Sequence, residues 1–195
     1  MDSGARVGMV HVIAALSLLD PLVALDWRIQ REIQTWRSPS LDPVMKAVTD
    51  VGKPQIVVGS LLGIALFTGP AGPATARVAL AALVPTNAAV EITKRGVNRV
   101  RPDGEHKRSN ASFPSSHAAN AFAIALVFTY RWRRLAPAFI LFAAVVAFSR
   151  VYLNRHFASD VLFGAGIGLL FAWTAHRLRR RIGRTEAGAP AQPNS

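Results

Sequence analysis

Long apolar stretches alternate with short polar segments along this chain. A helix needs about 20 mostly apolar residues to cross a bilayer, and each stretch lies near the lower end of that range. The pattern therefore predicts an all-α integral membrane bundle of about six transmembrane helices. The apolar stretches run from about Val7 to Leu25, Val51 to Thr68, Ala74 to Val90, Ser115 to Tyr130, Leu135 to Leu153 and Phe157 to Ala175.

The first stretch differs from the others because it contains His11 and the Asp20-Pro21 pair and follows one cation, Arg6. These features leave a signal peptide as an alternative to a membrane span. No small-x-small cleavage site closes the apolar run, which favours an uncleaved anchor.

Two amphipathic patterns follow the first stretch. Leu25, Ile29 and Ile33 recur at helical spacing, and a second apolar face runs from Leu41 to Val51 after a possible N-cap at Ser40. We expect a pair of interfacial helices on the bilayer surface. Packing of one or both helices against the bundle is the alternative, because periodicity does not identify the surface that a helix faces.

Composition supports a membrane protein over a nucleic-acid-binding one. The 195 residues are 51% hydrophobic and 17% charged, and the formal net charge of +12 comes from cations beside apolar stretches instead of along one soluble face. The chain has no cysteine, which excludes disulfides and thiolate metal ligands. We expect one transmembrane domain over residues 1–184 and a disordered tail over residues 185–195.

The arginines also suggest an orientation in the cell membrane. Arg131, Arg133 and Arg134 follow the fourth apolar stretch, and several more follow the sixth, from Arg177 to Arg184. Dense arginine beside a span end marks the cytoplasmic face, so the C-terminus is expected there and the opposite loops outside.

Three clusters of residues suited to catalysis or ligand binding lie in those opposite loops. The first contains Lys94 and Arg101-Pro102, the second is Pro114-Ser115-Ser116-His117, and the third contains Ser149-Arg150, His156 and Asp160. Alternating spans bring all three to one face of the bundle. Cations beside two histidines indicate phosphoryl transfer through a histidine.

The spacings Lys-x6-Arg-Pro, Pro-Ser-x-His and Ser-Arg-x5-His-x3-Asp resemble the signature of the type 2 phosphatidic acid phosphatase superfamily. The resemblance covers residues 94–160, with Ser116 where the family usually has glycine. It implies a membrane lipid phosphate phosphatase that acts on phosphatidic acid, phosphatidylglycerophosphate or an isoprenyl pyrophosphate. The site is expected on the extracytoplasmic side, as in many bacterial relatives.

The residue types suggest a role for each histidine. On a helix, Asp160 lies on the same face as His156 and is expected to accept a hydrogen bond from one ring nitrogen, leaving the other free to attack phosphorus. His117 is expected to act as the general acid and later the general base. Helix capping is the alternative explanation for each histidine motif taken alone.

The remaining motif residues are expected to bind phosphate. Lys94, Arg101 and Arg150 supply cations for its oxygens, and the amides of Ser115 and Ser116 supply a helix N-terminus. No metal or other cofactor is needed for such a site. Arginines outside the spacings, such as Arg99 and Arg155, are expected to steer headgroups or anchor the interface.

Other motifs have simpler interpretations. Asp103, Glu105 and His106 lack a recognisable ligand spacing and are expected to form a solvated loop. Gly164-x-Gly166-x-Gly168 lies within the last apolar stretch, where small residues permit close helix packing.

Two further functions fit the same residues. A lipid phosphotransferase would pass the phosphoryl group from His156 to a second lipid, and a noncatalytic bundle would only bind phosphate. The predicted partners are a lipid phosphate substrate and membrane lipids, without nucleic acid. A soluble vanadium haloperoxidase relative would share the motifs, but the apolar spans argue strongly against it.

Overall fold

The computed structural model describes residues 20–105 and 110–187, which form helices and turns with no strand among them. The all-α prediction is confirmed. A helix over residues 20–35, named here the crossing helix, comes first, and a 3-10 turn at Arg133–Leu135 precedes α6. The other helices are α2 (Leu41–Asp50), α3 (Pro54–Phe67), α4 (Gly72–Val97), α5 (Ser116–Arg131), α6 (Ala136–Tyr152) and α7 (Ala158–Ala187).

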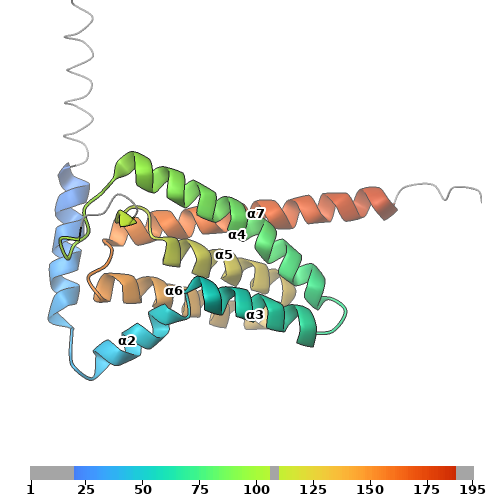
Figure 1. Cartoon of the computed structure of the whole chain (residues 1–195), viewed down its shortest axis with the longest axis horizontal. Coiled ribbons are helices and arrows are strands. Elements are labelled where there is room, and N and C mark those ends of the chain that lie inside the picture. The colour runs from blue at the N-terminus through green and yellow to red at the C-terminus, as the bar shows by residue number, and fades with distance from the viewer. Residues whose placement is uncertain (1–19, 106–109, 188–195) are drawn as a thin grey trace, which may run out of the picture.

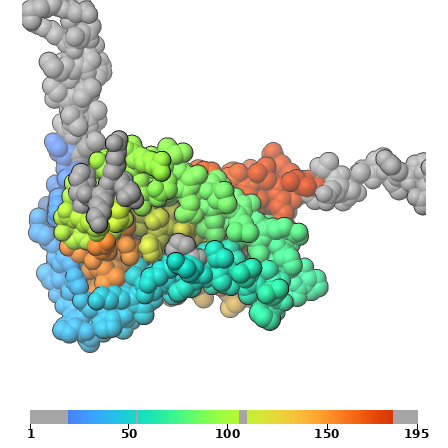
Figure 2. Space-filling model, in the orientation of Figure 1, coloured from blue at the N-terminus to red at the C-terminus, as the bar shows by residue number. Residues whose placement is uncertain are grey.

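Helices α3 to α7 run back and forth along one direction, and the crossing helix lies across one end of this bundle (Figure 1). Because the chain direction alternates, the last turns of α4 and α6 meet the first turns of α5 and α7 there. We call this the crossed end and the opposite one the far end. At the far end, the C-terminal part of α7 projects beyond the other helices (Figure 2).

Each of the helices α3 to α7 coincides with one of the last five predicted apolar stretches, although α4 and α7 continue beyond theirs to Val97 and Ala187. The predicted six membrane spans are not confirmed. Among the residues that the structure describes, two segments are long and apolar enough to cross a membrane, Arg133–Tyr152 and Ala158–Ile182. A third is obtained if α2 and α3, which meet at 57°, form one broken span. Helices α3 and α5 have only 14 and 16 residues, fewer than the roughly 20 that a span needs.

Two predictions concern the chain termini. Most of the first apolar stretch, including His11, lies outside the described residues. At the other end, α7 continues to Ala187, so the first three residues of the expected tail are helical. Residues 188–195 lie outside the described part.

The two amphipathic helices pack against the bundle. Ile33 of the crossing helix is buried in one cluster with Val151 and Tyr152 of α6, and Leu41 and Met45 of α2 pack against the same cluster. The structure therefore shows the packing against the bundle that the sequence left open as one alternative.

Glycines in α7 allow α5 to approach closely, as predicted. A Cβ atom on Gly164 would collide with the carbonyl of Ser115, and one on Gly168 would collide with the carbonyl of Ala119. A Cβ atom on Gly166 would meet nothing within 4 Å. The first and third glycines therefore set the position of the first turn of α5 relative to α7.

Candidate functional site

The crossed end brings the three sequence clusters together. Lys94 lies in the last turn of α4, His117 in the first turn of α5 and Arg150 in the last turn of α6. Arg101 comes from the loop after α4, and His156 from the turn between α6 and α7. His117 lies close enough to the other four side chains to interact with each electrostatically.

His156 is held in one orientation by a backbone carbonyl. Its side chain is 1% exposed, and its Nδ1 lies 2.7 Å from the carbonyl oxygen of Ser112. A carbonyl oxygen only accepts hydrogen bonds, so Nδ1 carries the proton and Nε2 keeps its lone pair. Burial lowers the pKa of His156 to about 4, further helped by Arg150 and opposed by Asp160. The imidazole is therefore neutral at pH 7.

Asp160 supports this arrangement differently from the prediction. Its Oδ2 lies 3.8 Å from Nδ1 of His156, too far for the expected hydrogen bond, because the Ser112 carbonyl occupies that direction. Oδ2 instead accepts from Ser112 Oγ at 2.5 Å and from the Phe157 amide at 2.8 Å. The aspartate therefore fixes both chain segments that hold the imidazole.

Arg99 completes the coordination of Asp160 and was not predicted to do so. Its Nη1 donates to Asp160 Oδ1 at 2.7 Å, and its Nη2 donates to Asp26 Oδ2 of the crossing helix at 2.8 Å. Ser159 also binds Asp26, through its amide at 3.0 Å and through its hydroxyl. The guanidinium lies 4.1 Å from the centre of the Phe157 ring. Arg99 thus links Asp26 of the crossing helix to Asp160, which holds the chain segments around His156.

A sequence signal for this role of the crossing helix exists. Asp26, Gln30 and Gln34 recur every four residues and share one face. Gln30 donates to the carbonyl of Val151 at 3.1 Å and to Asn154 Oδ1 at 2.7 Å. A polar stripe within an amphipathic helix predicts a polar partner, which here is the chain after α6.

The N-terminus of α5 uses one of its two predicted phosphate-binding amides internally. The backbone amide of Ser115 donates to the carbonyl of Asp160 at 3.0 Å. The side-chain Oγ of Ser115 accepts from the Ala118 amide at 3.4 Å. Ser115 is therefore a buried N-cap, and its amide is not free for a ligand. Ser116 and His117 occupy the next positions, whose amides have no acceptor within the helix.

Lys94, Arg101 and Arg150, named here the cation cluster, are all buried, at 5%, 5% and 8% exposure. Arg150 donates from Nη1 to Thr49 of α2 at 2.8 Å, and its buried Nε has no hydrogen-bond partner in the described part of the chain. Lys94 Nζ lies 3.8 Å from Glu91. Buried cations are costly unless they are paired, so the cluster favours an anion between them.

Arg101 is positioned by the loop that follows it. Its Nε donates to the Asn110 carbonyl at 2.9 Å, and its Nη2 donates to Asn110 Oδ1 at 2.5 Å. Burial lowers its pKa, and the nearby Arg155 acts in the same direction. Asn110 was not predicted, because no motif includes it.

The acidic loop residues bind an arginine. Arg155 pairs with Asp103 and Glu105, each at 2.7 Å. A hydrogen bond from Asn110 lowers the pKa of Glu105. His106 lies outside the described residues. Within residues 20–105 and 110–187, no three histidine, aspartate or glutamate side chains are grouped as a metal site would require.

A glycine places the chain between α2 and α3 directly against His117. A Cβ atom on Gly52 would lie 2.8 Å from His117 Cδ2, closer than real Cβ contacts allow. The contact keeps the imidazole between α5 and the α2–α3 turn. No sequence motif indicated this residue.

Comparison with known proteins agrees with this architecture. The chain is 36% identical over 103 residues to lipid A 1-phosphatase of Porphyromonas gingivalis, a match that covers 51% of this chain and 22% of that protein. It is 34% identical over 107 residues to phosphatidylglycerophosphatase B of Bacillus subtilis, covering 48% and 53%. The two matches thus span about a fifth of the lipid A 1-phosphatase and about half of the phosphatidylglycerophosphatase B.

Two solved structures share the fold. Aquifex aeolicus LpxE superposes with a TM-score of 0.71 at 24% identity, covering 78% of this chain and 95% of that one. The first transmembrane PAP2 type phosphatidylglycerolphosphate phosphatase of Bacillus subtilis gives a TM-score of 0.69 at 25% identity, covering 93% and 98%.

The family model described as the PAP2 superfamily matches residues 75–184, which contain all three sequence clusters. This match covers more than half of the chain. The protein is therefore a membrane protein that belongs to the PAP2 superfamily.

Proposed function

We propose that the protein is a lipid phosphatase that hydrolyses a phosphomonoester or pyrophosphate through a phosphohistidine on His156. The orientation of His156 carries the proposal, because its Nδ1 is bound to the Ser112 carbonyl and its pKa is lowered to about 4. A buried, neutral imidazole with a fixed tautomer is prepared for nucleophilic attack. The candidate substrates are phosphatidic acid, phosphatidylglycerophosphate and isoprenyl pyrophosphate.

In the first half-reaction, Nε2 of His156 attacks phosphorus. The bond between phosphorus and the leaving oxygen breaks, and His117, which the bound phosphate anion keeps protonated, donates a proton to that oxygen. The cation cluster and the amides of Ser116 and His117 surround the other phosphoryl oxygens and stabilise their charge.

In the second half-reaction, His117 takes a proton from water. The water oxygen bonds to phosphorus, the bond from phosphorus to Nε2 breaks, and inorganic phosphate leaves. Asp160 does not touch the substrate in this scheme. It acts through Ser112 and the Phe157 amide, which keep the imidazole in place.

Charge neutralisation by the cation cluster makes a metal ion unnecessary in this proposal. Three cations lie in a buried site, and low polarity strengthens their effect on a phosphoryl group. The expected activity therefore persists in a chelator.

The names of the relatives support a lipid substrate. They include the two phosphatases described above and undecaprenyl-diphosphatase BcrC of Bacillus subtilis, which is 29% identical over 69 residues. A lipid phosphotransferase would form the same intermediate on His156, and only the acceptor of the phosphoryl group would differ.

The test compares His156→Gln with His176→Asn in purified protein supplied with lipid phosphates and a chelator. His176 lies on α7 outside the candidate site, stacked on Tyr130 of α5, and is the matched control. We expect phosphate release from wild type and from the control, and none from His156→Gln. A labelled phosphoenzyme that is stable in alkali and labile in acid would identify phosphohistidine. Activity in His156→Gln would refute the assigned nucleophile, and transfer of label to lipid would indicate the phosphotransferase.

We also propose that the crossed end faces outward from the cytoplasm. Arg131, Arg133 and Arg177 lie toward the far end, and the positive-inside rule assigns that end to the cytoplasm. The chain has no cysteine, so a single Asp103→Cys or Arg133→Cys variant reports its own location. In intact cells, an impermeant maleimide should label the Asp103→Cys variant and not the Arg133→Cys variant. Labelling of Arg133→Cys alone would show that the orientation is opposite to the proposed one.

A further inference from the structure

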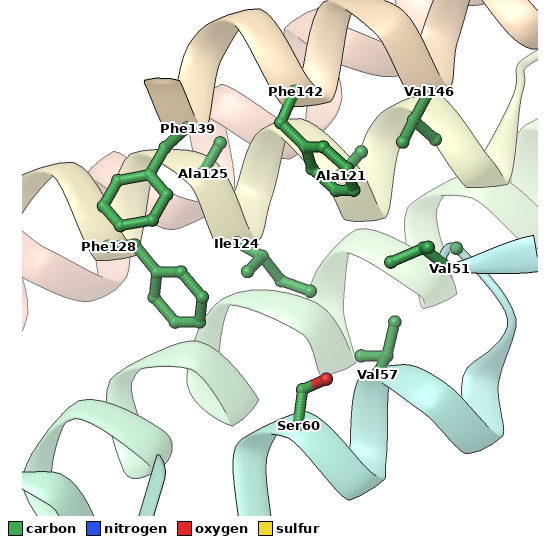
Figure 3. Close-up of a pocket in the computed structure, with 11 residues that line it drawn as sticks. Val51, Val57, Ser60, Ala121, Ile124, Ala125, Phe128, Phe139, Phe142 and Val146 are labelled. Carbon is green, nitrogen blue, oxygen red and sulfur yellow. The ribbon is translucent and has the colours of Figure 1, made fainter. Parts of the chain in front are cut away.

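An apolar pocket of about 320 Å³ begins beside the candidate site and lies between α3, α5 and α6. Figure 3 shows Val51 and Val146 at one end of this pocket and Phe128 and Phe139 at the other. The end near Val51 also includes Gly52, the residue that contacts His117. The pocket therefore starts at the general acid.

Two further lining residues lie one helical turn from residues of the candidate site. Ala121 lines the pocket and follows His117 by one turn of α5, while Val146 lines it and precedes Arg150 by one turn of α6. From Ala121, the pocket extends along α5 to Phe128, a distance of about 10 Å at 1.5 Å per residue. A phosphate held at the cation cluster would thus have its attached group directed into this pocket.

The lining is apolar from its first residues onward. Among the described lining residues, Ser60 alone carries a polar side-chain atom, and it lies on α3 away from the Val51 end. Phe142 is 48% exposed and Ser60 is also exposed, so a longer chain can leave the pocket sideways between α3 and α6.

We propose that this pocket holds the chain of a prenyl phosphate or prenyl pyrophosphate and selects it over a diacylglycerol phosphate. The inference rests on the proposed function and names its substrate class. In a prenyl phosphate, hydrocarbon begins at the carbon that bears the phosphate. In a diacylglycerol phosphate, two ester groups follow within a few bonds and would lie against Val51, Ala121 and Val146. These side chains offer the esters no hydrogen-bond donor, so their desolvation is uncompensated.

The first experiment measures kcat/KM of the purified full chain for farnesyl pyrophosphate, isopentenyl pyrophosphate and dioctanoyl phosphatidic acid. We expect at least a tenfold preference for farnesyl pyrophosphate over phosphatidic acid. Equal or reversed values would overturn the pocket assignment and leave the proposed phosphatase intact. No phosphate release from any substrate would overturn the proposed function as well.

The second experiment fills the pocket. Ser60→Trp should reduce kcat/KM for farnesyl pyrophosphate at least tenfold and leave that for the short isopentenyl substrate unchanged, which also shows that the variant is folded. Ile56→Trp is the matched control, because Ile56 is exposed on the same helix outside the pocket lining. An unchanged ratio between the two substrates in Ser60→Trp would refute the proposal.

Enlarging the pocket gives an independent check should Ser60→Trp fail to fold. Phe142→Ala removes one wall and should lower the preference for farnesyl pyrophosphate over isopentenyl pyrophosphate about threefold or more, since chain contacts are lost. A preference that stays at the wild-type value would count against the pocket.

Discussion

The two ends of the bundle use arginine in opposite ways. At the crossed end, Arg101 and Arg150 are buried, and each is oriented by a neutral partner, Asn110 or Thr49. At the far end, Arg177 and Arg179 are exposed on the last turns of α7. Charge counts along the chain do not separate these groups. Burial and partners do, because only a desolvated and oriented cation acts strongly on a bound phosphate.

The sharpest test of this difference removes one charge from each end. Arg150→Gln should lower kcat/KM about 10²- to 10³-fold, as expected for a lost donor to transition-state charge. Arg134→Gln, on an exposed arginine near the far end, should leave kcat/KM unchanged. Phosphate-release kinetics on both variants measure the contrast, and similar losses would show that burial does not distinguish the ends.

The next test concerns the packing that positions the crossed end. Gly164→Ala places a Cβ atom against the Ser115 carbonyl and should destabilise the protein by about 1–3 kcal/mol, the usual cost of overpacking. Gly166→Ala has open space and should be neutral. Thermal unfolding in detergent compares the two variants. Equal melting temperatures would mean that α5 and α7 are not held by this contact.

A smaller effect is expected from the crossing helix. Asp26→Asn removes the negative charge that pairs with Arg99. It should lower kcat about tenfold with little change in KM, because Asp26 acts through Arg99 and Asp160 and does not touch the substrate. Glu32→Gln, on an exposed position of the same helix, is the control. A rise in KM alone would assign Asp26 to substrate binding, contrary to its place in the structure.

The smallest effect within the physiological range concerns pH. His156 must be neutral to attack, and burial lowers its pKa to about 4, so the loss of kcat/KM that protonation of His156 causes should appear as pH decreases through about 4. An ordinary histidine would give this acid limb near 6.5. His176→Asn at the far end should leave the profile unchanged. The contrary outcome is an acid limb near pH 6.5, with an NMR titration of the His156 ring that gives the same pKa. It would show that the crossed end is more solvated than the structure indicates.

Much of the architecture follows from local sequence signals. The apolar stretch from Leu135 to Leu153 corresponds to α6 (Ala136–Tyr152), and that from Ser115 to Tyr130 corresponds to α5 (Ser116–Arg131). These bounds were predictable because Ser115 is an N-cap and the charged residues after each stretch end the apolar run. The crossing of residues 20–35 over the bundle end was not, since it depends on contacts with residues more than 100 positions away.

The site shows the same division. The histidines and the cation cluster lie in recognisable spacings, so sequence reasoning brings them together. Ser112, Thr49 and Gly52 contribute a carbonyl, a hydroxyl and an absent side chain. Such contributions depend on three-dimensional position more than on residue type, and a single sequence carries little signal for them. The expected bond between His156 and Asp160 was wrong because a backbone carbonyl takes its place.

The location of Asp26 and Thr49 has a practical consequence for anyone who shortens this protein. Residues 75–184 include every motif that a family search would recognise. A gene fragment limited to that range would nevertheless encode Arg99 without its Asp26 partner and Arg150 without Thr49. A motif search would score such a fragment as complete, although it would lack the contacts that hold Arg99 and Arg150 in place.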